Sequence, residues 1–303
     1  MHNVGGHLLS LCDLGVSYGG AQVVHGVSLD VEPGEIVGIV GESGSGKSTV
    51  LRAVAGLLGR TGWVSAGQIL YKGENLVEAP VKRVAALRGP ELAYVFQDPT
   101  ASLDPLCKVG VQFDECIRAH GLASGDAMRA LECDLLLEMG FEDPARVLGS
   151  YPHELSGGMC QRVVLAISVA MSPALLLADE PTSALDVTSQ QQVSKLLLRI
   201  RDQHDCAMLV VSHNVGAIAL VADRIGVMYE GRLVEVGDRD QVLHEPAHPY
   251  TKTLIAAVPR RNRNWAGVSA AEHPSVELPA AKLPAAELPE AESSAAPLSD
   301  RGM

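Results

Sequence analysis

The sequence predicts an α/β fold with a mostly parallel core sheet, an α-helical subdomain and a disordered C-terminal tail. Two short runs, ALLLAD at 174–179 and AMLVVS at 207–212, are apolar throughout, as strands buried on both faces of a parallel sheet are. The amphipathic segment SQQQVSKLLLRIRDQ lies between them and predicts a helix. A third apolar run, EIVGIV at 35–40, leads directly into a glycine-rich stretch. Strands that alternate with helices in this way are typical of α/β domains.

The segments around these strands predict the rest of the fold. Residues 7–31 alternate between apolar and polar side chains on either side of the turn YGGAQ, which predicts strands of an antiparallel β subdomain. The run TVLRAVAGLL has the period of a helix. We expect further strands and turns over 67–97, ending in the strand LAYVF. A helical subdomain is predicted over about 100–172, where ECDLLLEMG and QRVVLAISVAM are the clearest helices.

The C-terminal part of the chain has a different composition. From about residue 262 it is rich in Ala, Pro and Glu, with the near-repeat ELPAA-KLPAA-ELPEA at 277–291. Such a segment buries too little apolar surface to offset its ordering entropy. The sequence therefore predicts a folded domain over 7–261 and a disordered, solvated tail over 262–303.

Composition excludes several classes of function. The chain has 303 residues, 47% of them hydrophobic, and a formal net charge of −12, which argues against nucleic acid as a partner. We expect no secretion signal, because the N-terminus lacks a basic start and a long apolar core. No apolar run reaches the roughly 20 residues that span a bilayer. The six cysteines form no CxxC pair, so neither zinc nor an iron–sulfur cluster is expected.

The glycine-rich stretch GESGSGKS fits the phosphate-binding pattern G-x-x-x-x-G-K-[ST]. Glycines let successive backbone N–H groups point at phosphate oxygens, and the following helix adds partial positive charge. Lys47 is placed for the β- and γ-phosphates and Ser48 for Mg²⁺. A plain glycine-rich turn is the alternative, which the strand–loop–helix context disfavours. The candidate ATP-binding residues of this loop are Gly41, Glu42, Ser43, Gly44, Ser45, Gly46, Lys47, Ser48 and Thr49.

The strand ALLLAD ends in an acidic pair. A phosphate loop needs a carboxylate for its metal ion and a group that orients the attacking water. Asp179 is placed for the first role and Glu180 for the second. An acidic pair after a strand is often only a surface turn, but the phosphate loop upstream favours the functional interpretation.

At this point the sequence resembles the ATP-binding-cassette (ABC) ATPase family, over roughly residues 7–260. LSGGM at 155–159 is similar to the family's signature sequence, and SALD at 183–186 is similar to its D-loop. Gln97 in VFQDP resembles the Q-loop glutamine, and His213 in VVSH resembles the switch histidine. Several motifs therefore agree in order and spacing, and the resemblance implies the ABC cassette form of the P-loop NTPase fold.

The resemblance also implies roles for single residues. Glu180 would be the general base, His213 would hold the γ-phosphate and the attacking water, and Gln97 would reach Mg²⁺ and that water. Tyr18 stands where the family carries an aromatic that stacks on adenine, although a packed strand aromatic is the plainer interpretation. Asp186 would lie at a dimer seam, or cap the following helix, or both.

The signature residues imply a dimer. In the family this turn caps the ATP bound to the partner subunit's phosphate loop, because its serine and glycines present donors to anionic oxygen. Met159 stands where many members have glutamine, and Asn214 stands where aspartate is frequent. We expect little loss from Met159, because the donors precede it. The candidate signature residues are Leu155, Ser156, Gly157, Gly158 and Met159.

Two further segments resemble the branch of the family that powers peptide and nickel importers: FQDPTASLDP at 96–105 and EPAHPYTKTLIAAVP at 245–259, within a predicted C-terminal segment at 245–261. This branch implies a five-part importer, in which this chain lies at the cytoplasmic face of the membrane. Its other parts are two integral-membrane permease subunits, a substrate-binding protein outside the cytoplasm, and a second ATPase subunit. We favour a heterodimer over a homodimer. The expected cofactors are ATP and Mg²⁺, and the expected cargo is di- or oligopeptides.

Two alternatives stay open. A nickel or metal-chelate importer would have the same ATPase, because cargo is chosen by the other subunits. A non-transport ABC ATPase of DNA repair or translation is less favoured, since this chain has one cassette and an acidic charge.

Overall fold

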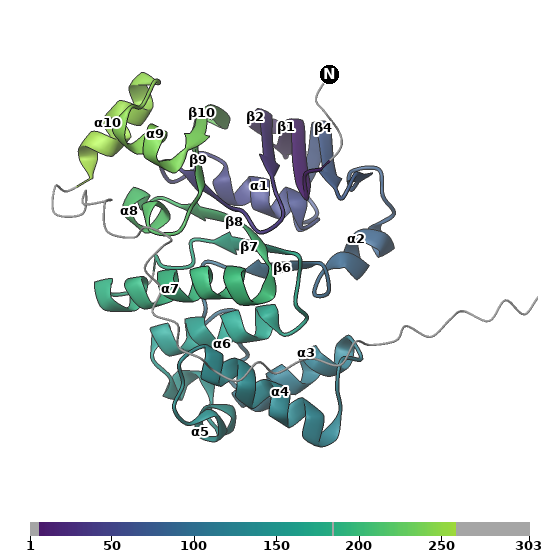
Figure 1. Cartoon of the computed structure of the whole chain (residues 1–303). Helices are drawn as coiled ribbons and strands as arrows, with labels where there is room; N and C mark the ends of the chain where they lie inside the picture. Colours follow the sequence, from purple (N-terminus) through teal and green to yellow (C-terminus); the bar gives the residue numbers. More distant parts are fainter. Residues whose placement is uncertain (1–5, 184, 259–303) are drawn as a thin grey trace, which may run out of the picture. The chain divides into compact units, whose positions relative to one another are not determined.

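The computed structural model describes residues 6–183 and 185–258 and contains two β-sheets flanked by helices (Figure 1). The order of the six-stranded sheet is β10-β9-β3-β8-β7-β6, and that of the four-stranded sheet is β2-β1-β4-β5. The strands are β1 (Leu9–Tyr18), β2 (Ala21–Val31), β3 (Ile36–Val40), β4 (Gly62–Tyr71), β5 (Glu74–Asn75), β6 (Leu92–Val95), β7 (Leu175–Asp179), β8 (Ala207–Ser212), β9 (Arg224–Tyr229) and β10 (Arg232–Asp238).

Five strands of the six-stranded sheet run parallel, and only β10 pairs antiparallel, with β9. The predicted apolar strands are its centre: β3, β7 and β8 are buried along their whole lengths. Their side chains alternate between two hydrophobic cores, so that Met208 and Val210 of β8 join one core and Leu209 and Val211 the other. The prediction of a mostly parallel sheet buried on both faces is confirmed.

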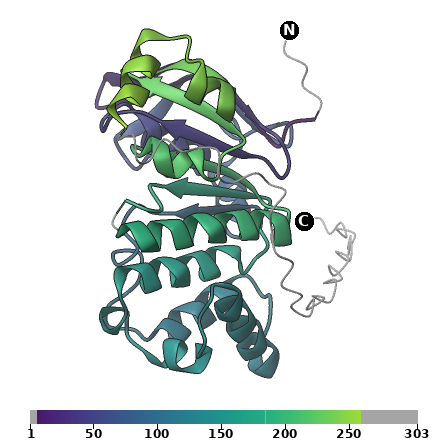
Figure 2. The same ribbon diagram turned by 60° about the vertical axis from the view of Figure 1, so that its left-hand side comes forward.

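The helices divide between these two cores. The first core packs the central sheet against α3–α8, and the second packs its other face against α1 and the antiparallel sheet. Figures 1 and 2 show α6 and α7 running side by side below the central sheet, with α3, α4 and α5 beyond them. The helices are α1 (Lys47–Val54), α2 (Val81–Leu87), α3 (Val109–Ala119), α4 (Gly125–Glu138), α5 (Pro144–Gly149), α6 (Gly157–Val169), α7 (Val187–His204), α8 (Val215–Ala219), α9 (Arg239–His244) and α10 (Pro249–Ala257).

The antiparallel sheet confirms the strands expected over 7–31. β1 pairs antiparallel with both β2 and β4, and Gly19 and Gly20 form the turn between β1 and β2. The expectation of only strands and turns over 67–97 is wrong in one place, because α2 lies there. This helix directly follows Pro80. It has seven residues, which are too few to show a helical period in the sequence.

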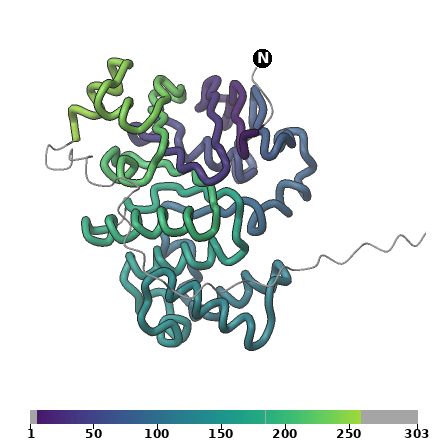
Figure 3. Tube along the Cα trace, viewed as in Figure 1, coloured from purple at the N-terminus to yellow at the C-terminus, as the bar shows by residue number. Residues whose placement is uncertain are grey.

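Helices fill the range from about 100 to 172, as the sequence predicts. It contains α3, α4, α5, a 3₁₀ turn at Pro152–Glu154, and α6, which the tube in Figure 3 follows as one continuous path. Within the described residues, no helix is both long and apolar enough to cross a membrane. The predicted tail at 262–303, the end of the C-terminal segment at 259–261, and position 184 of the SALD motif lie outside the described residues.

One acidic side chain is fully buried in the helical region. Glu132 of α4 accepts a hydrogen bond from Arg129 at 2.9 Å through Oε2. Its Oε1 atom has no donor among the described residues, and the Glu132 carboxyl group lies near that of Asp114 on α3, which itself pairs with Arg118. Burial is the main cause that raises the pKa of Glu132 to about 7, and the nearby Asp114 carboxyl group is the next. A buried carboxyl group beside a second carboxyl group is most stable there when it is protonated.

Glu132→Gln is expected to remove a pH dependence of stability. The folded-state pKa of Glu132 lies above its ordinary value of 4.5, so stability falls as the pH rises from about 4.5 to about 7. A glutamine can donate to Asp114 without titrating. At pH 8 the variant should therefore be more stable than the parent by on the order of 1–3 kcal/mol, with little difference at pH 5. Thermal unfolding over this pH range measures the effect, and Glu115→Gln, an exposed change on α3, is the control. Parallel profiles for parent and Glu132→Gln would contradict the raised pKa of Glu132.

Candidate functional site

The phosphate loop connects the end of β3 to the first residue of α1. Its first glycine is required by close packing, because a Cβ at Gly41 would lie 2.1 Å from the carbonyl oxygen of Met228 on β9. Gly46 stands at the N-cap of α1 with φ of 97°, a left-handed conformation that favours glycine. The loop exposes Glu42, Ser43 and Gly44, buries Gly41, Ser45, Gly46 and Lys47, and half-buries Ser48 and Thr49.

Lys47 is held inside its own loop. Its side chain is only 5% exposed, and Nζ donates to the carbonyl oxygens of Gly41 and Glu42 at 2.8 Å each. Burial lowers the pKa of Lys47, and the nearby carboxylates of Glu180, Asp179 and Glu42 oppose that shift. The ammonium group is thus largely dehydrated and bound to neutral carbonyls. An anion that reached the loop would offer it a stronger partner.

Ser48 and Asp179 lie together at the end of β7. Ser48 Oγ donates to Asp179 Oδ1 at 2.6 Å, and the Asp179 carboxylate is 1% exposed. Tyr94 Oη on the neighbouring strand β6 donates to Oδ2 at 3.1 Å. Burial raises the pKa of Tyr94, and the negative charge of Asp179 raises it further. The Tyr94 hydroxyl therefore stays protonated and can donate. A hydroxyl and a carboxylate oxygen in contact are the hard donors that suit Mg²⁺.

Glu180 and His213 meet at the ends of adjacent strands. Asp179 ends β7 and Ser212 ends β8, and these strands pair in parallel. The Glu180 N–H donates to the carbonyl of Val211 at 2.9 Å, and the residue adopts a φ of 50°, which costs a non-glycine residue about 1 kcal/mol or more. His213 Nδ1 hydrogen-bonds Glu180 Oε2. The structure therefore brings both predicted residues to the edge where the phosphate loop lies.

The signature turn lies at the start of α6. Ser156 is the N-cap, and its Oγ accepts from the backbone N–H of Met159 at 3.3 Å. A Cβ at Gly158 would lie 3.1 Å from Ser189 Oγ, so the turn packs tightly against α7. Ser156 and Gly157 are exposed, while Leu155 and Gly158 are half-buried. In the part of the chain that the structure describes, no hydrogen bond joins this turn to residues 41–49.

Asp186 caps α7, as one of its two interpretations requires. Its carboxylate accepts from the N–H groups of Thr188 and Ser189 at 3.0 Å each, and from Ser189 Oγ at 2.7 Å. The hydrogen bond from the backbone N–H of Ser189 contributes most to lowering the pKa of Asp186. A role at a dimer seam stays a prediction, and the exposure of the side chain leaves it accessible to a partner.

Three further residues of the sequence prediction have less decisive positions. Gln97 follows β6 and is exposed, and among the described residues its side chain has no hydrogen bond to Ser48 or Asp179. The ring of Tyr18 lies against Gly62, where a Cβ would be 2.5 Å from Tyr18 Cε1. Tyr18 is thus a packed strand aromatic, and its contact with adenine stays a prediction. Asn214 caps α8 by accepting from the N–H of Ala217 at 3.3 Å.

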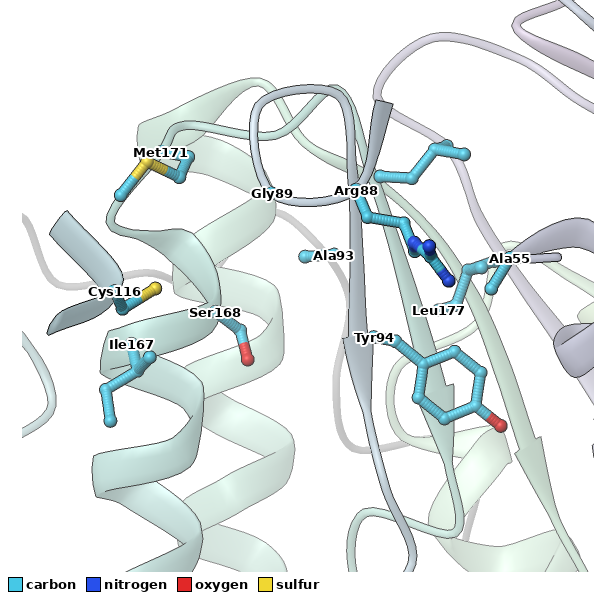
Figure 4. A pocket seen from close by; sticks show the side chains of 11 residues that line it. Ala55, Arg88, Gly89, Ala93, Tyr94, Cys116, Ile167, Ser168, Met171 and Leu177 are labelled. Atoms are coloured by element: carbon cyan, nitrogen blue, oxygen red, sulfur yellow. The ribbon is translucent and has the colours of Figure 1, made fainter. Parts of the chain in front are cut away.

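A cavity of about 200 Å³ lies beside this site, between β6 and the end of α1 on one side and α3 and α6 on the other (Figure 4). Its lining is mostly apolar and includes Ala93, Ile167 and Met171. Tyr94 contributes its ring to the cavity wall and its hydroxyl to Asp179. Neither the cavity nor Tyr94 was predicted from the sequence, where LAYVF shows only an apolar strand. Tyr94 depends on the pairing of β6 with β7.

The comparisons with known proteins agree with this geometry. Residues 24–183, more than half of the chain, match the ABC transporter family. The chain belongs to the ABC transporter family. Residues 234–281 also match the oligopeptide/dipeptide transporter C-terminal region, a range that includes most of β10 and all of α9 and α10.

Two curated relatives of this ABC transporter chain cover most of its length. The oligopeptide transport ATP-binding protein OppD of Bacillus subtilis (strain 168) is 42% identical over 257 residues, which are 83% of this chain and 72% of OppD. The dipeptide transport ATP-binding protein DppD of Escherichia coli (strain K12) is 43% identical over 256 residues, which are 83% of this chain and 78% of DppD.

Solved structures confirm the ABC cassette fold. CbiO1 of Clostridium perfringens, part of the transporter complex cbiONQ, superposes with a TM-score of 0.70 at 26% identity, covering 85% of this chain and 98% of that one. The cassette MJ0796, in a dimeric post-hydrolysis state bound to ADP and Pi, has a TM-score of 0.66 at 25% identity, covering 76% of this chain and 98% of that one. The predicted fold class is therefore confirmed.

Tyr94→Phe is expected to loosen Asp179 without disturbing β6. The change removes one hydroxyl that donates to a buried carboxylate, while the ring still fills the cavity wall. The free energy of unfolding should fall by about 1.5–3 kcal/mol, since hydrogen bonds to charged groups contribute on this scale. The concentration of Mg²⁺ needed for half-maximal ATP hydrolysis should rise. Unchanged stability and unchanged Mg²⁺ dependence would show that Tyr94 does not orient the carboxylate.

Proposed function

We propose that this chain is the ATP-hydrolysing subunit of an importer for di- and oligopeptides, acting at the cytoplasmic face of the membrane. The observation that carries the catalytic part is the convergence of Lys47, Ser48, Asp179, Glu180 and His213 at one edge of the central sheet. The peptide cargo is supported by the names of the relatives and by the C-terminal region shared with oligopeptide and dipeptide transporters.

Phosphate binding follows from the loop. Backbone N–H groups of residues 41–48 and the N-terminus of α1 form an anion site around Lys47. When ATP enters, the β- and γ-phosphates take the Lys47 ammonium from the carbonyls of Gly41 and Glu42. The buried position of Lys47 strengthens this attraction, because little water screens it. Tyr18 at the end of β1 would contact the adenine ring.

Hydrolysis requires a base beside the γ-phosphate. Glu180 accepts the proton of the attacking water, and His213, already hydrogen-bonded to Glu180, holds the water and the γ-phosphate. Ser48 and Asp179 would hold Mg²⁺, with Gln97 reaching it from the segment after β6. When bound, Mg²⁺ neutralises charge on the transferred phosphoryl group. Asp179 keeps its orientation through the hydrogen bond from Tyr94.

The active form is a head-to-tail dimer of ATPase subunits. Ser156, Gly157 and Gly158 of one subunit would cap the ATP bound to the partner's phosphate loop, with Asp186 at the seam. The exposure of Ser156 and Gly157 supports this role, since their donors are free to face a partner. A site divided between two subunits makes hydrolysis depend on closure. We favour a heterodimer with a second ABC ATPase, and a homodimer is the alternative.

The permease subunits would dock on the segment between β6 and α3. Three large apolar side chains are exposed on this segment and in the first turn of α3: Phe96 at 45%, Leu106 at 84% and Val111 at 46%. Apolar surface exposed to solvent can mark a site of protein contact. This proposed docking segment is adjacent to Gln97. Movement of a permease would therefore be transmitted to the Mg²⁺ site through a single loop. An extracytoplasmic substrate-binding protein would deliver the cargo to the two permeases.

Glu180→Gln is expected to retain ATP binding and to lower the ATPase rate by at least two orders of magnitude. The amide keeps the size of the side chain but cannot accept the proton of the attacking water. ATP should therefore accumulate in a closed dimer. Steady-state ATPase assays and equilibrium ATP binding on the parent and the variant measure the two effects. Hydrolysis near the parent rate would remove Glu180 as the base.

The cargo is tested on the complete transporter, purified with the partner subunits encoded beside it. Its ATPase activity is titrated with the substrate-binding protein loaded either with short peptides or with a nickel chelate. We expect several-fold stimulation by peptides alone. Stimulation by nickel alone would move the chain to a metal importer with the same catalytic residues. If no membrane partner copurified, a non-transport ABC ATPase would be the better conclusion.

A further inference from the structure

The segment HPYT at 248–251 places four side chains in four different environments. The N–H of Tyr250 donates to His248 Nδ1 at 3.2 Å, so the histidine caps α10. Pro249 occupies the first turn of the helix, where its fixed φ suits the position. Thr251 is fully buried beneath the helix. These three residues explain how α10 begins, and they leave Tyr250 without a role in forming the helix.

The start of α10 is tied firmly to β10. Glu235 of β10 accepts from the N–H groups of Ala247 and His248 at 2.7 and 2.9 Å. Burial opposes ionisation of this carboxyl group, but Thr251 and these two N–H donors outweigh it and hold the pKa of Glu235 below its usual value. β10 pairs in turn with β9, and β9 pairs with β3. The position of Tyr250 is thereby fixed relative to the strand that enters the phosphate loop.

Tyr250 reaches that loop directly. Its hydroxyl oxygen accepts a hydrogen bond from the backbone N–H of Glu42 at 3.2 Å, across 208 positions of the sequence. Its ring packs against Tyr229 at the end of β9, with 4.2 Å between the ring centroids and an angle of 35°. The ring pair orients the hydroxyl, because an aromatic ring packed on its neighbour has few alternative rotamers.

The Glu42 residue is therefore held at both of its backbone polar groups. Its N–H donates to Tyr250, and its carbonyl accepts from Lys47 Nζ at 2.8 Å. The turn that joins β9 to β10 holds the loop at a second point, where the N–H of Gly231 donates to the carbonyl of Ser45 at 3.1 Å. The C-terminal part of the chain thus forms the outer support of the loop that contains Lys47.

We propose that Tyr250 is a positioning residue for ATP binding, which holds the Glu42 peptide so that the loop and Lys47 are preorganised for the phosphates. The inference rests on the proposed role of residues 41–49 as the phosphate loop. It gives the C-terminal segment shared with oligopeptide and dipeptide transporters a function at the nucleotide. Without the tyrosine hydroxyl, Glu42 can hydrogen-bond water and its peptide can rotate, so ATP must order the loop when it binds.

Tyr250→Phe tests this contact in the full-length chain, because it removes the hydroxyl and keeps the ring pair. The Kd for ATP with Mg²⁺ and the KM for ATP should both rise about three- to tenfold, the range that one hydrogen bond accounts for. The kcat at saturating ATP should stay within about twofold of the parent, because bound ATP restores the loop. Deuterium exchange of a peptide covering residues 41–46 should be faster in the nucleotide-free variant.

Tyr229→Phe is the matched control, since it removes the other hydroxyl of the same ring pair, which bonds Glu230 rather than the loop. Its Kd, KM and exchange should equal those of the parent. Two results would overturn the proposal. One is an equal loss of ATP affinity in the two variants. The other is a Tyr250→Phe variant that lowers thermal stability without changing the Kd for ATP. Lys47→Ala separates the premise from the inference: if it binds ATP normally, the role of the loop is wrong. If it loses binding while Tyr250→Phe binds like the parent, only the role of Tyr250 is wrong.

Discussion

The parallel pairing of β8 with both β3 and β7 is the constraint on which the site depends. Val40 pairs with Ser212 and Asp179 pairs with Val211, so the three strands end at one edge of the sheet. The phosphate loop, the acidic pair and His213 each follow one of these ends. All three strands are buried on both faces, and a shift of one residue would exchange the side chains of the two cores. The packing of the cores therefore fixes the geometry of the site.

Opposite charges already meet at this edge before any nucleotide binds. Lys47 is buried within a loop of neutral carbonyls and lies near three carboxylates, those of Glu180, Asp179 and Glu42. The carboxylates stabilise the ammonium group against its loss of water, and the carbonyls hold it in place. A phosphate can take over the lysine without a large rearrangement, because the loop is already shaped by close contacts with β9.

The helical region and the C-terminal region differ in their relation to the site. The helical region carries the signature turn and an exposed apolar segment next to Gln97, which suits contacts with other subunits. The C-terminal hairpin of β9 and β10, together with α10, instead contacts the phosphate loop of its own chain. Through Tyr250, the region matched to oligopeptide and dipeptide transporters thus contacts residues 41–49 of the same chain.

Much of this protein could be predicted from local sequence. The apolar runs of β3, β7 and β8, the glycine-rich loop and the acidic pair each carry their signal in a few consecutive residues, because burial and phosphate binding restrict residue types directly. The family motifs placed Gln97 and the signature turn in the same way. The seven-residue α2 was missed, because so short a helix shows no period.

Other features were decided only by tertiary structure. Tyr94 reaches Asp179 because β6 pairs with β7, and Tyr250 reaches Glu42 across 208 positions because β9 and β10 carry α10 to the loop. Asp114 and Glu132 lie near each other because α3 packs against α4. The sequence by itself determined the central apolar strands, the phosphate loop and the family, since those depend on neighbouring residues. The contacts between distant side chains depended on strand order and helix packing, which no local pattern contains.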